Sequence, residues 1–193
     1  MSSEQSQCRP ERADRRRNRE VIVAAAREAF ARADAAGDAV SMNQVARAAD
    51  VGIATLYRHF PSRDELAAAV YLSKLDEVTA RARELARGQD ALGSIRIWVA
   101  EFASFMLATR GMMDTLRAAW QSATPFTSTA TARIAETIGA FLAVGATESS
   151  VRADVGAMDV TVAILALLST TPPGDPGTRT TRLLDLFIDG LAA

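Results

Sequence analysis

The sequence has very few of the residues on which most enzyme chemistry depends. Lys74 is its single lysine, Cys8 its single cysteine and His59 its single histidine. One cysteine excludes an internal disulfide, and together with one histidine it nearly excludes a zinc site of these ligands. Leu72-Ser73 precedes the lysine, so no Gly-Lys-Ser/Thr phosphate loop exists. We therefore expect a reduced, intracellular, non-enzymatic protein without a metal or cofactor.

Long hydrophobic runs are also missing. The longest apolar run, residues 160–168, is far shorter than the roughly 20 residues that a membrane-spanning helix needs. The polar start of the sequence contains no apolar segment typical of a signal peptide. We expect a cytoplasmic protein that has no membrane partner.

The charges are nearly balanced in total but unevenly placed. Lys plus Arg number 22 and Asp plus Glu number 23. Residues 1–63 hold 11 arginines and 8 acidic residues, a formal charge of +3, whereas residues 64–193 hold 11 basic and 15 acidic residues, a formal charge of −4. The basic part of the chain is the one suited to an anionic partner.

The apolar residues recur with the period of an α-helix nearly throughout, and no segment has the alternation of a strand. We predict an all-α protein of about nine helices after a disordered lead at residues 1–12. The predicted helices cover about residues 14–36, 41–49, 53–59, 62–87, 91–108, 112–121, 129–144, 156–170 and 178–191.

Local signals define the helices between residues 41 and 65. Ser41 to Gln44 and Ser62 to Glu65 each have the form of a capping box, which begins a helix. Asp50-Val51-Gly52 predicts a turn, because Asp tolerates the left-handed conformation and Gly adopts it freely. The helix at 53–59 should end before Pro61, since the residue that precedes proline avoids the helical region.

Residues 41–60 have the pattern of a helix-turn-helix motif. Two short helices can pack through an apolar seam that is formed by Val45, Ala46, Ala49, Val51, Leu56 and Phe60. The second helix then turns outward an unusually apolar and aromatic set of side chains, namely Ile53, Ala54, Thr55, Tyr57 and His59. Such a helix can enter the major groove of DNA, where Thr55 meets a base edge and Tyr57 and His59 bond phosphate oxygens.

This segment resembles the signature of the tetracycline-repressor (TetR/AcrR) family. The resemblance is carried by residues 51–66, VGIATLYRHFPSRDEL, centred on Thr-Leu-Tyr-x-x-Phe. The arginine-rich lead, the Ala-Ala-x-x-x-Phe of residues 25–30 and the Ser-Met-x-x-Val-Ala of residues 41–46 match as well. Together these motifs cover about residues 15–75.

The resemblance implies two domains. Residues 13–62, with the motif at 41–60, would form a helix-turn-helix DNA-binding domain, and residues 63–193 a helical ligand-binding and dimerisation domain. It places Ser41, Asn43 and Arg63 at the DNA backbone, and Gly52 at the opening of the recognition helix. An arm rich in arginine would reach the backbone or minor groove through Arg15, Arg16, Arg17 and Arg19.

Three positions depart from the family pattern. Asp50 replaces a frequent turn glycine, and Ala54 replaces a frequent glycine on the recognition helix, which should alter base preference. Asn43 stands where an acidic residue is common, so a charge that would repel phosphate is absent.

Large apolar residues in the later helices are consistent with a ligand cavity inside a helical core. We hypothesise a pocket between the helices at 91–108, 112–121 and 129–144, because Met fills irregular shapes and Trp can offer an N–H. The candidate lining residues are Trp98, Phe102, Phe105, Met106, Met113, Leu116, Trp120 and Ile138.

The two C-terminal helices are apolar over an arc too wide for one core contact. One side can face the core and the other a second subunit. The candidate dimer-interface residues are Val162, Leu165, Leu184, Phe187, Ile188 and Leu191.

The resemblance therefore implies a ligand-responsive repressor. It would bind double-stranded DNA at a palindromic operator as a homodimer and be released by a small apolar or aromatic effector. Two alternatives remain at this stage: a non-DNA helical adaptor or small-molecule-binding protein, and an all-α enzyme built on carboxylates.

Overall fold

The computed structural model of the protein describes residues 8–36, 39–87, 90–109, 112, 116, 124–170 and 178–193. These residues form eight α-helices and no strand, so the all-α prediction is confirmed for them. The chain divides by its contacts into unit one, residues 1–73 and 111–118, and unit two, residues 74–110 and 119–193. The predicted helix at 112–121 lies outside the described residues except for Met112 and Leu116, both helical and buried.

Helix α1 spans Cys8–Ala36 and begins earlier than predicted. The expectation of a disordered lead is wrong for residues 8–12, while residues 1–7 lie outside the described part. Pro10 falls in the first helical turn, where its missing N–H costs no hydrogen bond, and Glu and Arg residues that favour helix follow it. Further along, Ile22, Ala26 and Phe30 recur every four residues and are buried.

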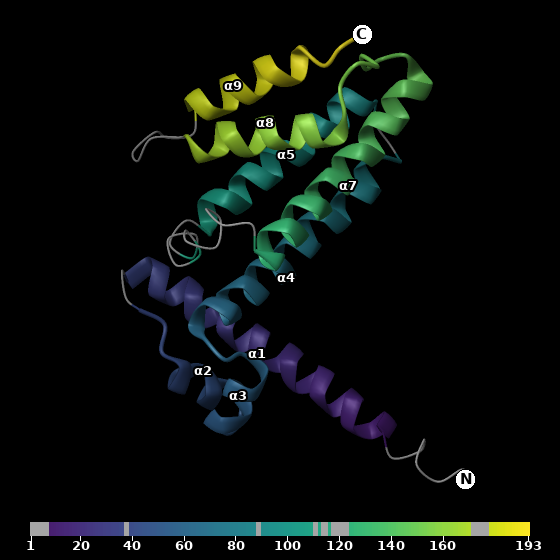
Figure 1. Ribbon diagram of the computed structural model, residues 1–193. Helices are drawn as coiled ribbons and strands as arrows, with labels where there is room; N and C mark the ends of the chain where they lie inside the picture. The colour runs from purple at the N-terminus through teal and green to yellow at the C-terminus, as the bar shows by residue number, and fades with distance from the viewer. Residues whose placement is uncertain are drawn as a thin grey trace, which may run out of the picture. The chain divides into compact units, whose positions relative to one another are not determined.

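Helices α2 (Met42–Ala48) and α3 (Ile53–His59) follow α1 in unit one, where α2 packs against α1 and α3 packs against α2 (Figure 1). Ser41 is the N-cap of α2 as predicted, but its side chain makes no capping hydrogen bond, so the first capping box does not form. Asp50 has a φ of 51°, the left-handed turn conformation expected of it. Gly52 is the N-cap of α3 with a φ of −65° and does not use its conformational freedom.

Helix α4 spans Arg63–Leu85 and contributes residues to both units. The Ser62 hydroxyl accepts a hydrogen bond of 3.1 Å from the Glu65 backbone N–H, which is one half of the predicted capping box. The chain between α3 and α4 passes through Phe60 in an extended conformation before Pro61, as the proline predicts. In unit one α4 buries Leu66, Val70 and Tyr71.

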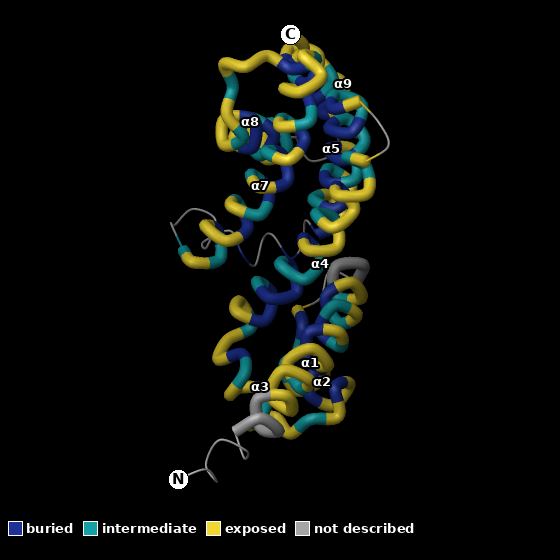
Figure 2. Tube along the Cα trace, turned by 90° about the vertical axis from the view of Figure 1, so that its right-hand side faces the viewer, coloured by how far each residue is buried: buried dark blue, intermediate teal, exposed yellow. Residues whose placement is uncertain are grey.

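Unit two consists of the second part of α4 with α5 (Ala91–Ala108), α7 (Pro125–Glu148), α8 (Ala157–Ser169) and α9 (Thr178–Asp189). Helix α5 packs against α7, α8 and α9, and α8 also packs against α7 and α9. Among the described helices only α5 is long and apolar enough to cross a membrane by length and composition. The buried side chains of α5 include Trp98 and Phe102, and Figure 2 shows buried and exposed stretches along this helix.

Helix α7 is longer at both ends than the sequence predicted. It begins at Pro125 because Thr124 and Thr127 form a reciprocal capping box and proline suits the first helical position. It continues through Gly145, beyond the predicted end at residue 144, to Glu148. Gly145 is buried, and its missing side chain lets Val151 pack against the helix.

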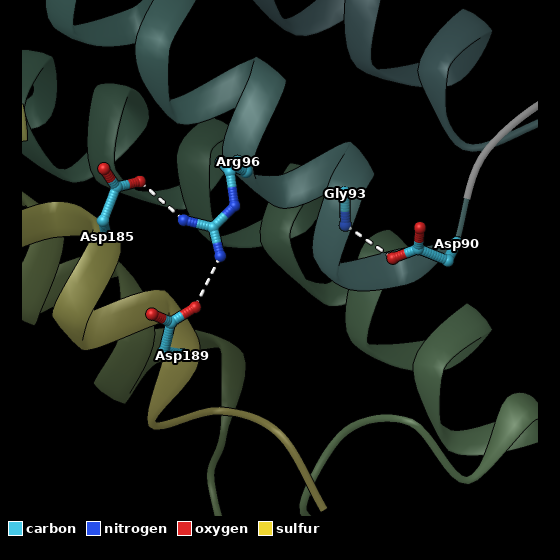
Figure 3. Close-up of polar contacts among 5 residues, drawn as sticks. All are labelled: Asp90, Gly93, Arg96, Asp185 and Asp189. Atoms are coloured by element: carbon cyan, nitrogen blue, oxygen red, sulfur yellow. Dashed lines mark hydrogen bonds and ion pairs between the residues drawn. The ribbon is translucent and has the colours of Figure 1, made fainter.

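Charged side chains tie α9 to α5. Arg96 on α5 donates from Nη1 to Asp185 at 2.5 Å and from Nη2 to Asp189 at 2.6 Å (Figure 3). The hydrogen bonds with Asp189 and Asp185 raise the pKa of the Arg96 guanidinium above its ordinary value. Asp90 caps the same helix by accepting a 2.6 Å hydrogen bond from the Gly93 N–H. The position of α9 is therefore set by polar contacts as well as by its apolar side.

Two glycines of α7 allow a matched test of this packing. A Cβ at Gly145 would clash with Val151 Cγ2, lie 2.8 Å from Val151 Cβ and lie 3.0 Å from Ala91 Cβ, whereas a Cβ at Gly139 would meet Ala157 Cβ at an ordinary 3.5 Å. We predict that Gly145→Ala lowers the free energy of unfolding by about 1–3 kcal/mol. Gly139→Ala should be neutral or raise it by up to about 1 kcal/mol, because Ala favours helix. Urea titration measures both, and equal effects would contradict this packing.

Candidate nucleic-acid interface

Helix α3 turns one narrow side into the core and leaves the rest accessible. Leu56 and Phe60 are 0% and 2% exposed and define the buried side. The side chains of Ile53, Ala54 and Tyr57 are exposed, and those of Thr55 and His59 are half-buried. Gly52, at the start of the helix, is exposed as well. Each residue predicted to face outward on this helix is thus accessible at least in part.

One exposed residue of α3 was not predicted as a site residue. Arg58 donates from Nη2 to the Thr55 hydroxyl at 3.1 Å and from Nε to the Ala54 carbonyl at 3.4 Å. In the sequence, Arg58 has the pattern of an ordinary charged residue on a solvent-exposed helix surface. The signal that could have found it is its spacing, three and four residues after the two small residues expected to meet DNA.

Helix α2 packs beside α3 and presents polar side chains. Asn43 is exposed, and Ser41, one position before the helix, is half-buried. Gln44 and Arg47 are exposed on the same helix and were missed by the sequence prediction, although both follow Asn43 at accessible helical positions.

The arginines near the start of α1 do not act as one group. The positive charges of Arg15 and Arg19 act on His59, and the Arg19 guanidinium lies 5.0 Å from the centre of the Phe60 ring. Arg16 instead pairs with Glu20 at 3.6 Å on the same helix. Arg17 is exposed. Successive helical residues face different directions, so the predicted set of Arg15, Arg16 and Arg17 is divided.

His59 lies in a positive environment. Partial burial lowers its pKa below 6.5, and the nearby charges of Arg15, Arg19 and Arg58 lower it further. At neutral pH the imidazole is therefore mostly uncharged, so it offers a hydrogen bond while the arginines supply the positive charge. This cluster joins the C-terminal end of α3 to the N-terminal half of α1.

Arg63 is held by an aromatic ring. Its Cζ lies 5.9 Å from the centre of the Phe30 ring, and its Nε is buried without a hydrogen-bond partner among the described residues. The stacking orders the side chain at the first turn of α4. The terminal nitrogens of a guanidinium carry four further N–H donors that suit a phosphate group.

Only part of the predicted ligand pocket comes together in unit two. Trp98 and Phe102 are buried and stacked, with ring centres 5.2 Å apart, and Phe105 and Ile138 are buried as well. Met106 is half-buried. The Trp98 Nε1–H already donates to the Val78 carbonyl at 3.0 Å, so it is engaged within the chain.

The predicted contribution from residues 112–121 to that pocket stays a prediction. Leu116 is buried, and its contacts group it with unit one. Met113 and Trp120 lie outside the described residues.

The predicted dimer residues are divided between two faces. Leu184, Ile188 and Leu191 are buried in the core of their own chain, so their assignment to a dimer interface is wrong. Val162 is exposed, and Leu165 and Phe187 are half-buried. The error is one of register on α9, whose apolar arc is wide enough for either side to look like the interface. The exposed large apolar residues of α8 and α9 are Met158, Val162, Leu183 and Leu186.

The described residues contain no group of three His, Cys, Asp or Glu side chains that could hold a metal ion. The chemistry assembled around α3 is that of hydrogen-bond donors and positive charge on a helix of suitable size for a DNA groove.

Comparison with known proteins gives two family matches that together cover most of the chain. Residues 22–70 match the model for bacterial regulatory proteins of the tetR family. Residues 89–193 match the model for the C-terminal domain of SbtR-like transcriptional regulators. No curated protein sequence matches the chain with statistical significance.

Solved structures of the same fold cover nearly the whole chain. The TetR transcriptional regulator SCO0520 from Streptomyces coelicolor is 28% identical with a TM-score of 0.64, and covers 90% of this chain and 98% of its own. A TetR transcription regulatory protein from Mycobacterium vanbaalenii is 29% identical with a TM-score of 0.62, and covers 95% and 100%. FadR from Thermus thermophilus, a TetR-family repressor solved with lauroyl-CoA, is 18% identical with a TM-score of 0.65, and covers 90% and 92%.

Proposed function

The chain belongs to the tetR family of bacterial transcriptional regulators, and we propose that it is a cytoplasmic, effector-released repressor that binds a palindromic operator as a homodimer. The observation that carries this proposal is α3. Its buried side is confined to Leu56 and to Phe60 directly after the helix, and the charges of Arg15, Arg19 and Arg58 act on His59 at its C-terminal end. A non-DNA adaptor would not need this concentration of arginine around one short helix, and no spacing of carboxylates in the sequence singles out a catalytic pair.

In this proposal α3 enters the major groove, with its first residues at the base edges. Gly52, Ile53 and Ala54 are small or apolar and permit close approach, while the Thr55 hydroxyl meets a base. Tyr57 and His59 lie to either side and bond phosphate oxygens, with Ser41 and Asn43 of α2 on the backbone. Arg15 and Arg19 supply charge near His59. Arg63 grips a phosphate from the start of α4.

The DNA-binding function is tested by the salt dependence of Arg63→Ala. One phosphate contact per half-site releases about one counterion, so the slope of log K against log salt should fall by about 1 per half-site. Affinity should weaken similarly for all sequences. The matched control is Arg32→Ala, which removes an exposed arginine paired with Glu28 on α1. Gel shifts with the DNA that flanks its own gene measure both. Failure of the unaltered protein to bind any DNA, or an unchanged slope for Arg63→Ala, contradicts the assignment.

The homodimer is supported by the accessible apolar sides of α8 and α9. Met158 and Val162 are separated by one helical turn on α8, as are Leu183 and Leu186 on α9, and all four are exposed. The two helices also contact each other, so their exposed side chains belong to neighbouring elements. A two-fold dimer of this kind presents α3 twice to the DNA, at a spacing of about one DNA turn, roughly 34–36 Å, which requires a palindromic operator.

The dimer is tested by placing a charge in this surface. Leu186 is 68% exposed, and in a two-fold interface Leu186→Glu introduces two carboxylates. We predict that the dimer dissociation constant rises by about 30- to 1000-fold. Leu107→Glu, at an exposed leucine of α5, is the control and should leave the dimer intact. Light scattering at micromolar concentration reports the mass. A monomeric unaltered protein, or a dimeric Leu186→Glu protein, contradicts this interface.

We further infer that the effector binds in unit two beside α5. The side chains of Phe102 and Phe105 are aromatic, and the adjacent Met106 is half-buried, an environment that suits an apolar molecule. The solved relative FadR carries lauroyl-CoA, an apolar chain on a larger group. Arg133 on α7 is paired with Asp76 on α4 at 2.6 Å, which joins the surroundings of α5 and α7 to the helix shared by both units. An effector that binds more tightly to the form unable to bind DNA lowers the operator affinity, at most by the ratio of its affinities for the two forms.

The effector site is tested by operator release. At least one member of a broad panel of fatty-acyl and aromatic compounds should release the protein from its operator and change tryptophan fluorescence. Phe105→Ala should raise the concentration for half-release roughly 10- to 100-fold, because a large apolar contact is lost. Leu107→Ala, at an exposed position of the same helix, should leave that concentration unchanged. A panel without any releasing compound, or equal effects of the two variants, counts against the site.

A further inference from the structure

Arg58 occupies the most outward position of α3. Successive residues of an α-helix are about 100° apart around its axis. Leu56 is the one buried residue of α3, and Arg58 follows it by two residues, so the two lie about 160° apart around the helix axis. Tyr57 and His59 fall on the two flanks. When α3 lies in a groove with its buried side away from DNA, Arg58 is the residue that faces the floor.

The side chain of Arg58 leans back toward the beginning of the helix. Its hydrogen bonds to the Thr55 hydroxyl and the Ala54 carbonyl place the guanidinium over the first turn of α3. That turn is the part of a recognition helix that meets base edges. Ala54 has a small side chain, so it leaves room for the guanidinium to approach a base pair.

The hydrogen-bond donors that remain on Arg58 and Thr55 suit the edge of a particular base. A guanidinium has five N–H donors, and the two recorded hydrogen bonds use two of them. The remaining donors can bond the O6 and N7 acceptors of guanine, which is the commonest specific contact of arginine in the major groove. The Thr55 oxygen accepts from Arg58 and keeps its own proton as a donor to a neighbouring acceptor.

We propose that Arg58 is a specificity-determining residue that reads one guanine in each half-site, with Thr55 as the group that orients it. This inference rests on the proposed DNA-binding function and adds to it the base that is read. It also assigns Thr55 a second role, because loss of its hydroxyl frees the guanidinium from the first turn of α3.

The experiment begins with operators selected from a random double-stranded library by the full chain. In the selected operator, each guanine is replaced in turn by 7-deazaguanine, which lacks the N7 acceptor, and by adenine. For the unaltered protein, one guanine per half-site should be sensitive, with a loss of roughly 5- to 150-fold on replacement by adenine. For Arg58→Ala and Arg58→Lys, the same replacements should change affinity by less than about twofold, because the bidentate contact is absent.

Arg47→Ala provides the matched control, since it removes an equally exposed arginine from α2. It should weaken binding without changing which guanine is sensitive. Thr55→Val should reduce the sensitivity of the guanine without abolishing it. Circular dichroism before each titration confirms that the variants are folded.

Each other result has a defined meaning. If Arg58→Ala weakens every operator by one factor and keeps the same sensitive guanine, Arg58 contacts phosphate and the inference is wrong. An operator in which no guanine is sensitive also overturns it. In both cases the DNA-binding function stands. If the full chain enriches no sequence at all, the proposed function itself fails, and the inference fails with it.

Discussion

The burial of Leu56 and Phe60 fixes how α3 is rotated, and the rest of the interface depends on that rotation. A helix of seven residues has too few side chains to be held by more than one narrow side. The helix ends at His59, two residues before Pro61, and the buried Phe60 ring closes the core while the chain turns into α4. Ala54, Thr55 and Arg58 then face away from the core because no other rotation buries both anchors. The packing of Leu56 and Phe60 in the core therefore determines which side chains of α3 are available to recognise the DNA sequence.

The near-neutral charge of the protein is compatible with DNA binding because its arginines are placed by aromatic rings. Arg19 lies over Phe60 and Arg63 lies over Phe30, so two cations of unit one rest against the side chains that build its core. A stacked guanidinium loses less freedom when it meets a phosphate than a freely moving side chain does. Few charges with fixed positions favour binding that depends on operator sequence as well as on salt.

The sequence predicted α3 and α5 with the correct bounds, because Gly52, Pro61 and Asp90 define their ends locally. The sequence-based predictions failed where a contact between residues far apart in the chain determines the end or the orientation of a helix. The extension of α7 through Gly145 depends on Val151, and the orientation of α9 depends on Arg96 with Asp185 and Asp189. The apolar arc of α9 is so wide that the sequence does not show which side of the helix faces the core, so Leu184 and Ile188 were assigned to the wrong face. Arg58 was missed because the sequence does not show its hydrogen bonds to Thr55 and Ala54, which distinguish it from other exposed arginines.

In the proposed complex, α3 of two subunits enters the major groove through the side opposite Leu56 and Phe60. Dimethyl sulfate interference on a selected operator tests it directly, since this reagent methylates guanine N7 in the major groove and adenine N3 in the minor groove. The account predicts two zones of interference at guanine N7, related by symmetry and about 10 base pairs apart. Interference confined to adenine N3, or a single zone without a symmetric partner, would contradict it.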